Sequence, residues 1–278
     1  NVIGRNVNIS AYNSSGYGAS SGYRTVNRLS LLGSCVTLNS DNDITQTLAT
    51  GSLIDVRTKN DGRITGSGFI GNQININSSK DISSYAIGDR IKVNSSNGSV
   101  YGYTLGHNIK IDQANGTDTS SFVAGRSITI NNTCATRSLN TLMTAMCSTF
   151  TNVSGTRSPI YASYLAAADA NISASPIFGD SIRTCSTTLY ASPLIGQALS
   201  LCGTTANYSP VMGGHIDLTN AQIDTTPIIG SGINFSGSTN QAQRSTILGT
   251  TLSFSDTRVN DTTILGTGNS FANGNIDS

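Results

Sequence analysis

Apolar and polar residues alternate along most of this chain, and the alternation restarts at a small residue that recurs at regular intervals. Two apolar residues usually precede it, as in Ala86-Ile87-Gly88. We call this residue the anchor and number each repeat from it as position zero. The anchors are Gly4, Gly33, Gly51, Gly71, Gly88, Gly106, Gly125, Thr144, Ala162, Gly179, Gly196, Gly213, Gly230, Gly249 and Gly266. Such a fixed period is the signature of a solenoid, in which one repeat makes one coil.

Positions after the anchor predict a β-strand. Positions +3 and +5 are apolar, with Val, Ile and Leu dominant, whereas position +4 between them is polar in nearly every repeat. Position +3 is polar only at Asn269. Position +5 lacks a large apolar residue at Thr149, Ala167 and Thr184. This alternation is typical of a half-buried strand, so the inward residues of successive coils are expected to stack as the core.

The two positions before the anchor are both apolar in almost every repeat. Adjacent residues of a strand point to opposite faces, so this part of the strand is expected to be buried on both sides. One side is the interior of the coil, whereas the other needs a further layer, which we assign to partner chains. The interface candidates occupy position −2: Ile160, Ile177, Leu194, Val211, Ile228, Ile247 and Ile264.

All five prolines occupy position −3 of consecutive repeats: Pro159, Pro176, Pro193, Pro210 and Pro227. Proline lacks the N–H that a strand interior would use, so each is expected where a strand begins. The links between strands are rich in Ser, Asn, Asp and Gly and predict turns on the outer surface. The small residue at the anchor predicts either special backbone geometry or a close approach of two backbones.

The repeats predict one all-β domain, a parallel β-solenoid over residues 1–278 that is irregular at 10–30. About 15 coils of 17–19 residues each, rising about 4.8 Å per coil, would form a rod roughly 70 Å long. The chain begins in the middle of the pattern, at Val2-Ile3-Gly4, which we interpret as a processed product or a fragment.

Charge and cysteine content exclude several classes of function. The formal net charge is +1 with 11% charged residues, so nothing favours nucleic acid as a partner. Five cysteines without a Cys-x-x-Cys motif do not indicate a disulfide framework, and no cofactor is expected. No apolar run reaches the roughly eighteen residues of a membrane span, so no membrane insertion of this segment is expected.

Residues for catalysis are sparse. His107 and His215 lie six coils apart, roughly 29 Å along the stack, so they cannot form one site within a chain. Asp41, Asp43 and Asp55 are interpreted as residues of turns and links, although a pair of acids across two chains stays open. The sequence has no Ser-His-Asp pattern and no phosphate-binding loop. We therefore expect a protein without enzymatic activity.

Two pairs of residues should stack in neighbouring coils. Cys185 and Cys202 share position +6, where a disulfide is conceivable but a column of small buried or turn residues is favoured. Lys92 and Lys110 share position +4. With the nearby tyrosines they are candidates for binding a host glycan or protein, although the tyrosines equally suit packing of the links. These tyrosines are Tyr85, Tyr101 and Tyr103.

The repeats also resemble a known family. Ala86-Ile87-Gly88-Asp89-Arg90-Ile91-Lys92-Val93 and Leu105-Gly106-His107-Asn108-Ile109-Lys110-Ile111 are similar to the head repeats of trimeric autotransporter adhesins, the YadA-like head, and to related repeats of bacteriophage tail fibres. The resemblance implies a left-handed parallel β-roll wound into a homotrimer, with the Ile-Gly strand along the trimer axis. The repeat is longer than is typical of the family, which predicts longer outer links.

We therefore expect a structural or adhesive trimeric fibre segment that spaces and presents links for binding a host surface. Its location would be extracellular, on a bacterial cell surface as an adhesin head or on a phage virion as a tail fibre. One alternative is a monomeric ice- or surface-binding solenoid, which needs a flat ladder of threonines. Another is a polysaccharide-degrading fibre enzyme, which needs clustered acids or histidines.

Overall fold

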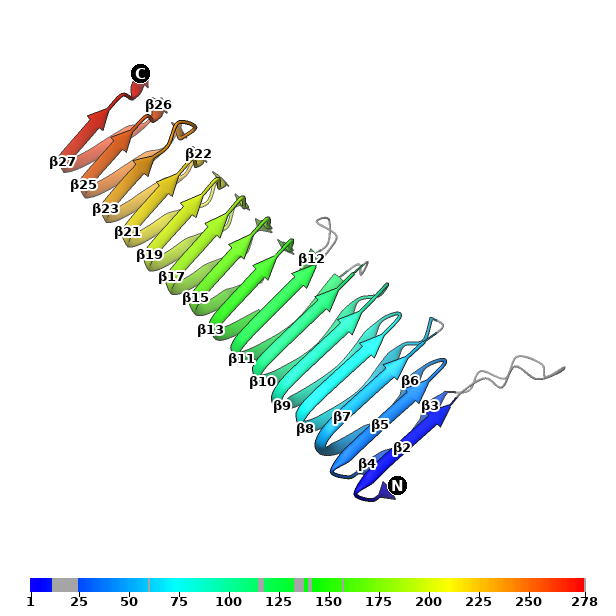
Figure 1. Cartoon of the computed structure of the whole chain (residues 1–278). Helices are drawn as coiled ribbons and strands as arrows, with labels where there is room; N and C mark the ends of the chain where they lie inside the picture. Colours follow the sequence, from blue (N-terminus) through cyan, green and yellow to red (C-terminus); the bar gives the residue numbers. More distant parts are fainter. Residues whose placement is uncertain are drawn as a thin grey trace. The chain divides into compact units, whose positions relative to one another are not determined.

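The computed structural model describes residues 1–11, 25–59, 61–114, 118–132, 138–139, 142–156 and 158–277. The regular structure of these residues is β-strand, and neighbouring strands pair in parallel. They group into two compact units, Asn1–Thr141 (the first unit) and Leu142–Ser278 (the second unit). In each unit the strands stack as a β-solenoid, which confirms the predicted fold class (Figure 1).

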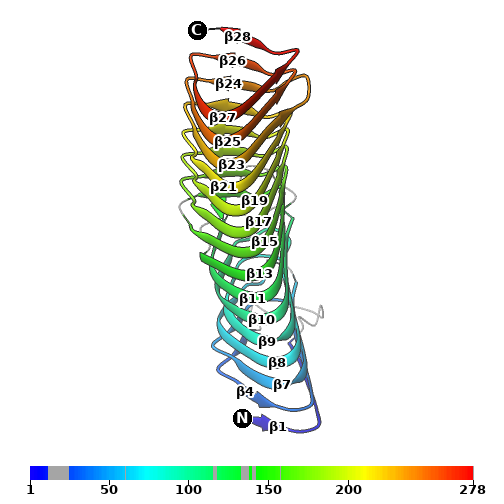
Figure 2. The same cartoon turned by 90° about the vertical axis from the view of Figure 1, so that its left-hand side faces the viewer.

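Each coil of the second unit has a long strand and a short one. The long strands are β13 (Leu142–Thr151), β15 (Ile160–Ala168), β17 (Ile177–Cys185), β19 (Leu194–Cys202), β21 (Val211–Thr219), β23 (Pro227–Ser236), β25 (Thr246–Ser255) and β27 (Thr263–Ala272). The short strands are β14 (Ser154–Thr156), β16 (Asn171–Ser173), β18 (Thr188–Tyr190), β20 (Thr205–Asn207), β22 (Gln222–Asp224), β24 (Gln241–Gln243), β26 (Arg258–Asn260) and β28 (Asn275–Asp277). Long strands pair with long and short with short, giving two columns (Figure 2).

The first unit follows the same plan with some strands joined. Its strands are β1 (Val2–Ile3), β2 (Asn6–Ala11), β3 (Val26–Asn27), β4 (Ser30–Leu32), β5 (Cys35–Ser40), β6 (Ile44–Thr45), β7 (Leu48–Thr58), β8 (Ile64–Ser78), β9 (Ile82–Ser95), β10 (Val100–Gln113), β11 (Asp118–Asn132) and β12 (Ser138–Leu139). In β8 the start pairs with short β6 and the rest with long β7, so a short strand runs directly into the next long one. The irregular segment predicted at 10–30 lies mostly outside the described residues.

The predicted core positions are confirmed. Residues at position +3, such as Ile54, Ile91 and Ile216, are at most 2% exposed. Position +5 is equally buried, and at the C-terminal end of the second unit it forms a ladder of parallel rings. Phe235 and Phe254 stack at 4.9 Å between ring centroids. Rings in this arrangement add to the stabilisation given by burial alone.

The prediction that position −2 faces a partner chain is wrong. Ile160, Ile177, Leu194, Val211, Ile228 and Ile247 are at most 4% exposed within the single chain, and Ile264 in β27 is half-buried. The strand turns a corner just after the anchor: Gly179 pairs with Gly196 and Ser181 with Ala198, but position +1 is left out of the ladder. Because the corner shifts the alternation by one residue, position −2 points into the core and position −1 points outward.

The sequence analysis assigns Thr144 as an anchor, which is one residue too early. In the structure Ala145, not Thr144, is in register with the anchor Ala162. Position +5 of that coil is therefore the fully buried Phe150, while Thr149 is exposed. Phe150 pairs with Ala167 in the next coil, so a small residue at this position accommodates the large ring beside it.

Of the two explanations offered for the anchor, close backbone approach is confirmed. No described anchor has a positive φ angle. A Cβ atom built on Gly230 would lie 2.7 Å from the carbonyl oxygen of Gly213 and 3.0 Å from Cδ1 of Ile216. The same crowding by the preceding anchor's carbonyl recurs at Gly51 and Gly88. Glycine is therefore favoured because the bends of successive coils nest into one another.

The sequence predicts that the links are turns. In the structure they also contain strands. In the second unit each contains a short strand whose middle residue points into the core, such as Ile172, Leu189 and Ile223, each at most 1% exposed. The same column in the first unit includes Ile44 and Ile64. The core is therefore closed by the links themselves.

Hydroxyl side chains at position −4, directly before the prolines, tie successive coils together. The main-chain N–H of Ser175 donates to Oγ of Ser192 at 3.2 Å, and that of Ser192 donates to Oγ of Ser209 at 3.0 Å. Ser209 donates in turn to Oγ1 of Thr226 at 3.2 Å. These residues are buried, so the ladder satisfies N–H groups that would otherwise lack partners.

Each link of the second unit turns at residues with left-handed backbone. Position +7 is mostly Asn, Asp or Gly, including Asn220 at φ 53° and Gly203 at φ 55°. These residue types adopt this conformation at low cost. Position −5 is less suited to it, because Ala191 has φ 48° and the β-branched Thr225 has φ 51°.

Replacing Thr225 with Asn is expected to stabilise the second unit by about 1 kcal/mol, because Asn tolerates the left-handed region and a β-branched residue does not. Urea unfolding of the parent and the variant measures the change. Thr205→Asn in the extended strand β20 is the matched control and should bring no gain. Equal stability changes at the two sites would contradict this explanation.

Candidate functional site

An exposed apolar face lies on the N-terminal side of the anchors. We call it the apolar face and define it by positions −3 and −1. In the second unit, position −1 consists of Tyr161, Phe178, Ile195, Met212, Ile229, Leu248 and Leu265 in successive long strands. Ile195, Met212 and Ile229 remain 37%, 39% and 39% exposed. Contiguous apolar surface of this kind on a monomer indicates an interaction site.

Position −3 of the same face is the proline column. Strands β15, β17, β19 and β21 begin directly after their prolines, as predicted, and β23 begins at Pro227 itself. The proline carbonyls still serve the ladder, since Pro193 accepts the N–H of Ile177 at 2.8 Å. On this face the rings of Tyr161 and Phe178 stack at 5.2 Å with 9° between their planes. The face therefore presents rigid, uncharged side chains.

The first unit carries the same face. Leu32, Ile70 and Ile87 at position −1 are 50%, 39% and 41% exposed. Beside them Tyr85 and Tyr103, at position −3 of neighbouring strands, line an apolar hollow of about 460 Å³. Its other walls are Ile87, Leu105 and Phe122. The two tyrosines therefore belong to the apolar face.

A groove lies on the other side of the anchors in the first unit. Its volume is about 670 Å³, and it is lined by aliphatic residues, Leu53 and the Val and Ile at position +3, together with the polar side chains at positions +2 and +4 from Cys35 to Thr129. Gln73, Asn75 and Asn108 contribute amides. The groove follows the stacking direction because it is lined by the same two positions in successive strands.

Three cationic side chains gather at one part of this groove. Arg90 and Lys92 come from β9 and Lys110 from β10, and Lys92 is directly in register with Lys110. Lys110 pairs with Asp112 at 3.0 Å and Arg90 lies 3.7 Å from Asp89. Among the described residues, no ion pair involves Lys92.

The structure thus separates the five predicted binding residues into different places. Lys92 and Lys110 lie in the groove, whereas Tyr85 and Tyr103 lie on the apolar face at the other side of the corner. Tyr101 is 37% exposed and lines neither the groove nor the hollow. The sequence prediction missed Arg90, although position +2 falls on the same outward side as position +4 in the alternation.

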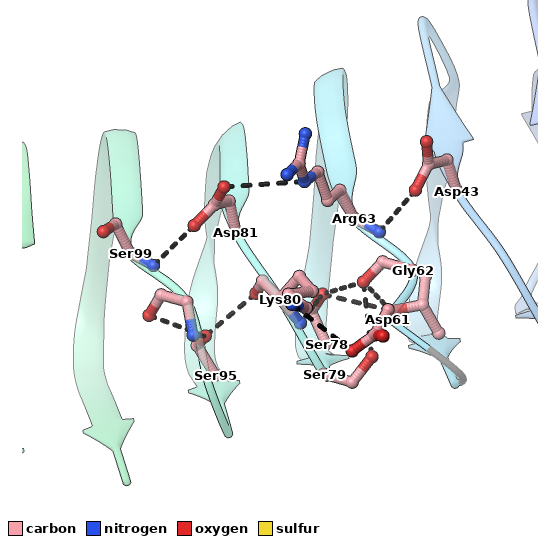
Figure 3. Close-up of polar contacts among 12 residues, drawn as sticks. Asp43, Asp61, Gly62, Arg63, Ser78, Ser79, Lys80, Asp81, Ser95 and Ser99 are labelled. Atoms are coloured by element: carbon pink, nitrogen blue, oxygen red, sulfur yellow. Dashed lines mark hydrogen bonds and ion pairs between the residues drawn. The ribbon is translucent and has the colours of Figure 1, made fainter. Parts of the chain in front are cut away.

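Carboxylates at the link edge of the first unit connect neighbouring coils (Figure 3). Asp43 Oδ1 accepts the main-chain N–H of Arg63 at 2.7 Å, and Asp81 Oδ1 accepts that of Ser99 at 2.8 Å. The Arg63 side chain reaches the other oxygen of Asp81 at 3.6 Å. Asp55 differs, because it lies within strand β7 and pairs with Arg57 of the same strand at 2.8 Å. The contact of Asp43 agrees with its interpretation as a residue of a turn or link, whereas that interpretation is wrong for Asp55.

The two histidines are each paired with a carboxylate on an exposed surface. His107 Nδ1 lies 2.7 Å from Asp89 Oδ1, and His215 Nε2 lies 3.2 Å from Asp217 Oδ2. Within the described residues no three His, Cys, Asp or Glu side chains gather as metal ligands would.

Cys185 and Cys202 are in register on β17 and β19, as predicted, and both are free thiols. Burial is the main cause that raises the pKa of Cys202, and the neighbouring Cys185 adds to it. A thiol with a raised pKa is less often a thiolate and so is less reactive. This fits the interpretation of the pair as a structural column.

Asp224 in β22 has the clearest electrostatic partner of the second unit. The guanidinium of Arg244 donates to both carboxylate oxygens, with 3.0 Å between Nε and Oδ1. This hydrogen bonding is the main reason that the pKa of Asp224 is lower than its ordinary value. The pair connects two successive links across the solvent-facing surface.

Replacing Arg244 with Gln is expected to lower the thermal midpoint at pH 7. Because the pKa of Asp224 is lowered in the folded parent, the stabilisation is complete above the ordinary carboxyl pKa and is lost as the pH falls through the lowered value. The midpoints of parent and variant should therefore converge as the pH falls below the ordinary carboxyl range. Calorimetry across this range tests the pair, and a pH-independent difference would exclude the charge effect.

No family model, curated protein or solved structure matches this chain. Within the described residues no helix has the length and apolarity that crossing a membrane would require.

Proposed function

We propose that this chain is a non-enzymatic structural segment of an extracellular fibre, which assembles as a homotrimer and presents surfaces for attachment to a host. The apolar face carries the proposal. Position −1 side chains such as Ile195, Met212 and Ile229 are more than one third exposed in the single chain, and apolar residues recur at this position in most coils of each unit. Water contact with a surface of this kind is unfavourable, so a partner should cover it.

A second copy of the chain is the occupant that fits this face best. The stacked strands fix the spacing of its side chains at about 4.8 Å per coil. Another copy necessarily has the same spacing, so apolar side chains of two chains can meet at every level. The face has no charge pattern that would select a different protein, since its two positions are Pro, Ile, Leu, Met and aromatic residues in most coils.

Three copies and the left hand of the β-roll follow from the resemblance to YadA-like heads and phage tail-fibre repeats. In that arrangement position −1, rather than position −2, lies closest to the trimer axis. The fibre would belong to a bacterial surface adhesin or to a phage virion, and its outward surfaces would provide the attachment sites. The engagement of carboxylates such as Asp43 and Asp81 in coil-to-coil contacts supports a role without catalysis.

The mass of the full chain in solution tests this proposal. Light scattering or native mass spectrometry at micromolar concentration should give three times the 28.8 kDa of one chain. A parent protein that remains monomeric would overturn the proposed assembly, because the apolar face would then be a stable solvent-exposed surface.

A further inference from the structure

We infer that the groove of the first unit binds a linear polysaccharide that carries carboxylate groups, with Lys92 and Lys110 as the anion-binding pair. This inference names a ligand class for the attachment role proposed above. It depends on that proposal only for its biological setting, because every residue involved belongs to one chain.

The placement of the two lysines carries the inference. Lys92 and Lys110 are directly in register on the parallel strands β9 and β10, and both are exposed in the groove. Like charges directly opposite each other on neighbouring strands destabilise a sheet. Arg90 adds a third cation on the same side of β9. Asp112 offsets part of this repulsion at Lys110, and a bound carboxylate would relieve the rest and would form charge-assisted hydrogen bonds with the ammonium groups.

The remaining lining favours a hydroxyl-rich ligand. Gln73 precedes Arg90 in the +2 column and Asn108 follows it, while Asn75 precedes Lys92 in the +4 column. Asn75 donates to Asp55, a carboxylate that also lines the groove and is paired with Arg57, so Gln73 and Asn108 are the amides best placed to contact a ligand. Side-chain amides both donate and accept hydrogen bonds, which matches the hydroxyl groups of sugars. The groove spans several coils at about 4.8 Å each. Its volume of about 670 Å³ lies in the range of ligand-binding sites.

Two other polymers fit less well. A peptide strand would need free backbone groups at a sheet edge, but β8, β9 and β10 have strands paired on both sides. A nucleic acid would need a strong positive field. Here Lys110 and Arg90 already have carboxylate neighbours, and the chain has a net charge of only +1. A weakly acidic polysaccharide therefore matches the groove better than either.

Calorimetric titration of the full chain with a hexamer of galacturonic acid tests the inference. The methyl ester of the same hexamer keeps most hydroxyls but lacks the charges, so it should bind at least tenfold more weakly. The Lys92→Ala/Lys110→Ala variant should lose at least tenfold in affinity for the acid. Gln73→Ala should weaken binding of acid and ester alike. Binding of the acid should also weaken as salt is added.

The Arg63→Ala/Lys80→Ala variant is the matched control, because it removes the same two charges from the link edge of the first unit. It should bind the acid within twofold of the parent. An equal loss of affinity in both double variants would show that only the net charge matters. The assignment of Lys92 and Lys110 as the binding site would then be wrong. No binding at millimolar concentration, or equally tight binding of polyglutamate or a single-stranded oligonucleotide, would overturn the inference as well. Light scattering on the same samples keeps the assembly question separate, since a monomer that binds the acid would refute only the trimer.

Discussion

Replacing Ile195 and Ile229 together with Asp is expected to convert the assembled protein into folded monomers. Both residues occupy position −1 and are more than one third exposed in the single chain, so the substitutions leave the core intact. In an assembly each Asp would bury a charge without a partner, at a cost of several kcal/mol. Light scattering should show the mass falling to about one third, while circular dichroism stays unchanged.

The neighbouring residues provide an internal comparison. Leu194 and Ile228 precede the two isoleucines directly but are 0% exposed in the core. Replacing this pair with Asp should unfold the second unit instead of dissociating it. A third variant, Ala166→Asp/Ser253→Asp, places the same charges at position +4 of β15 and β25, where neither faces another carboxylate, and should change neither mass nor fold. Unfolding by the Ile195/Ile229 variant, or an unchanged mass, would contradict the assignment of the apolar face.

Residue periodicity predicted the core of this fold well, because position +3 and position +5 are buried in successive coils. The interface was predicted on the wrong side of the strand. If the alternation ran straight through the anchor, position −2 would lie on the same outward side as position +4. The corner at position +1 breaks this rule, and only the missing ladder pair at residues such as Asp180 and Gln197 reveals it.

A sequence signal for the corner nevertheless exists. Position −2 and position +3 are five residues apart and both are apolar in nearly every repeat. An odd separation cannot place both side chains on one face of a straight strand, so the chain must turn between them. The short strands were missed for a related reason. Their single buried residue, such as Ile172 or Ile223, is too short a pattern to predict a strand.

The candidate site could be predicted only in part. Stacking of Lys92 on Lys110 follows from the period alone and is confirmed by their register. Whether the tyrosines shared a surface with the lysines depended on the corner, which separates Tyr85 from Lys92 within the single strand β9.

Replacing the anchor Gly230 with Val is expected to destabilise the second unit by about 3 kcal/mol or more. The first added carbon alone would lie 2.7 Å from the carbonyl oxygen of Gly213 and 3.0 Å from a buried methyl of Ile216. Neither neighbour can move without shifting a coil of the core. Ala145 and Ala162 show that some coils accommodate a single methyl at the anchor, so Gly230→Ala should cost less than the branched residue.

Gly232→Val is the matched control, since it changes the same residue type two positions further along β23. A Cβ there would lie 3.2 Å from Nδ1 of His215, whose exposed side chain can rotate away at the cost of a solvent-exposed contact with Asp217. Valine suits an extended strand, so this variant should stay within about 0.5 kcal/mol of the parent. Urea unfolding compares the two variants. Equal losses would show that glycine matters at both positions for flexibility alone, whereas a loss confined to Gly230 would show that the nested backbones set the requirement for glycine.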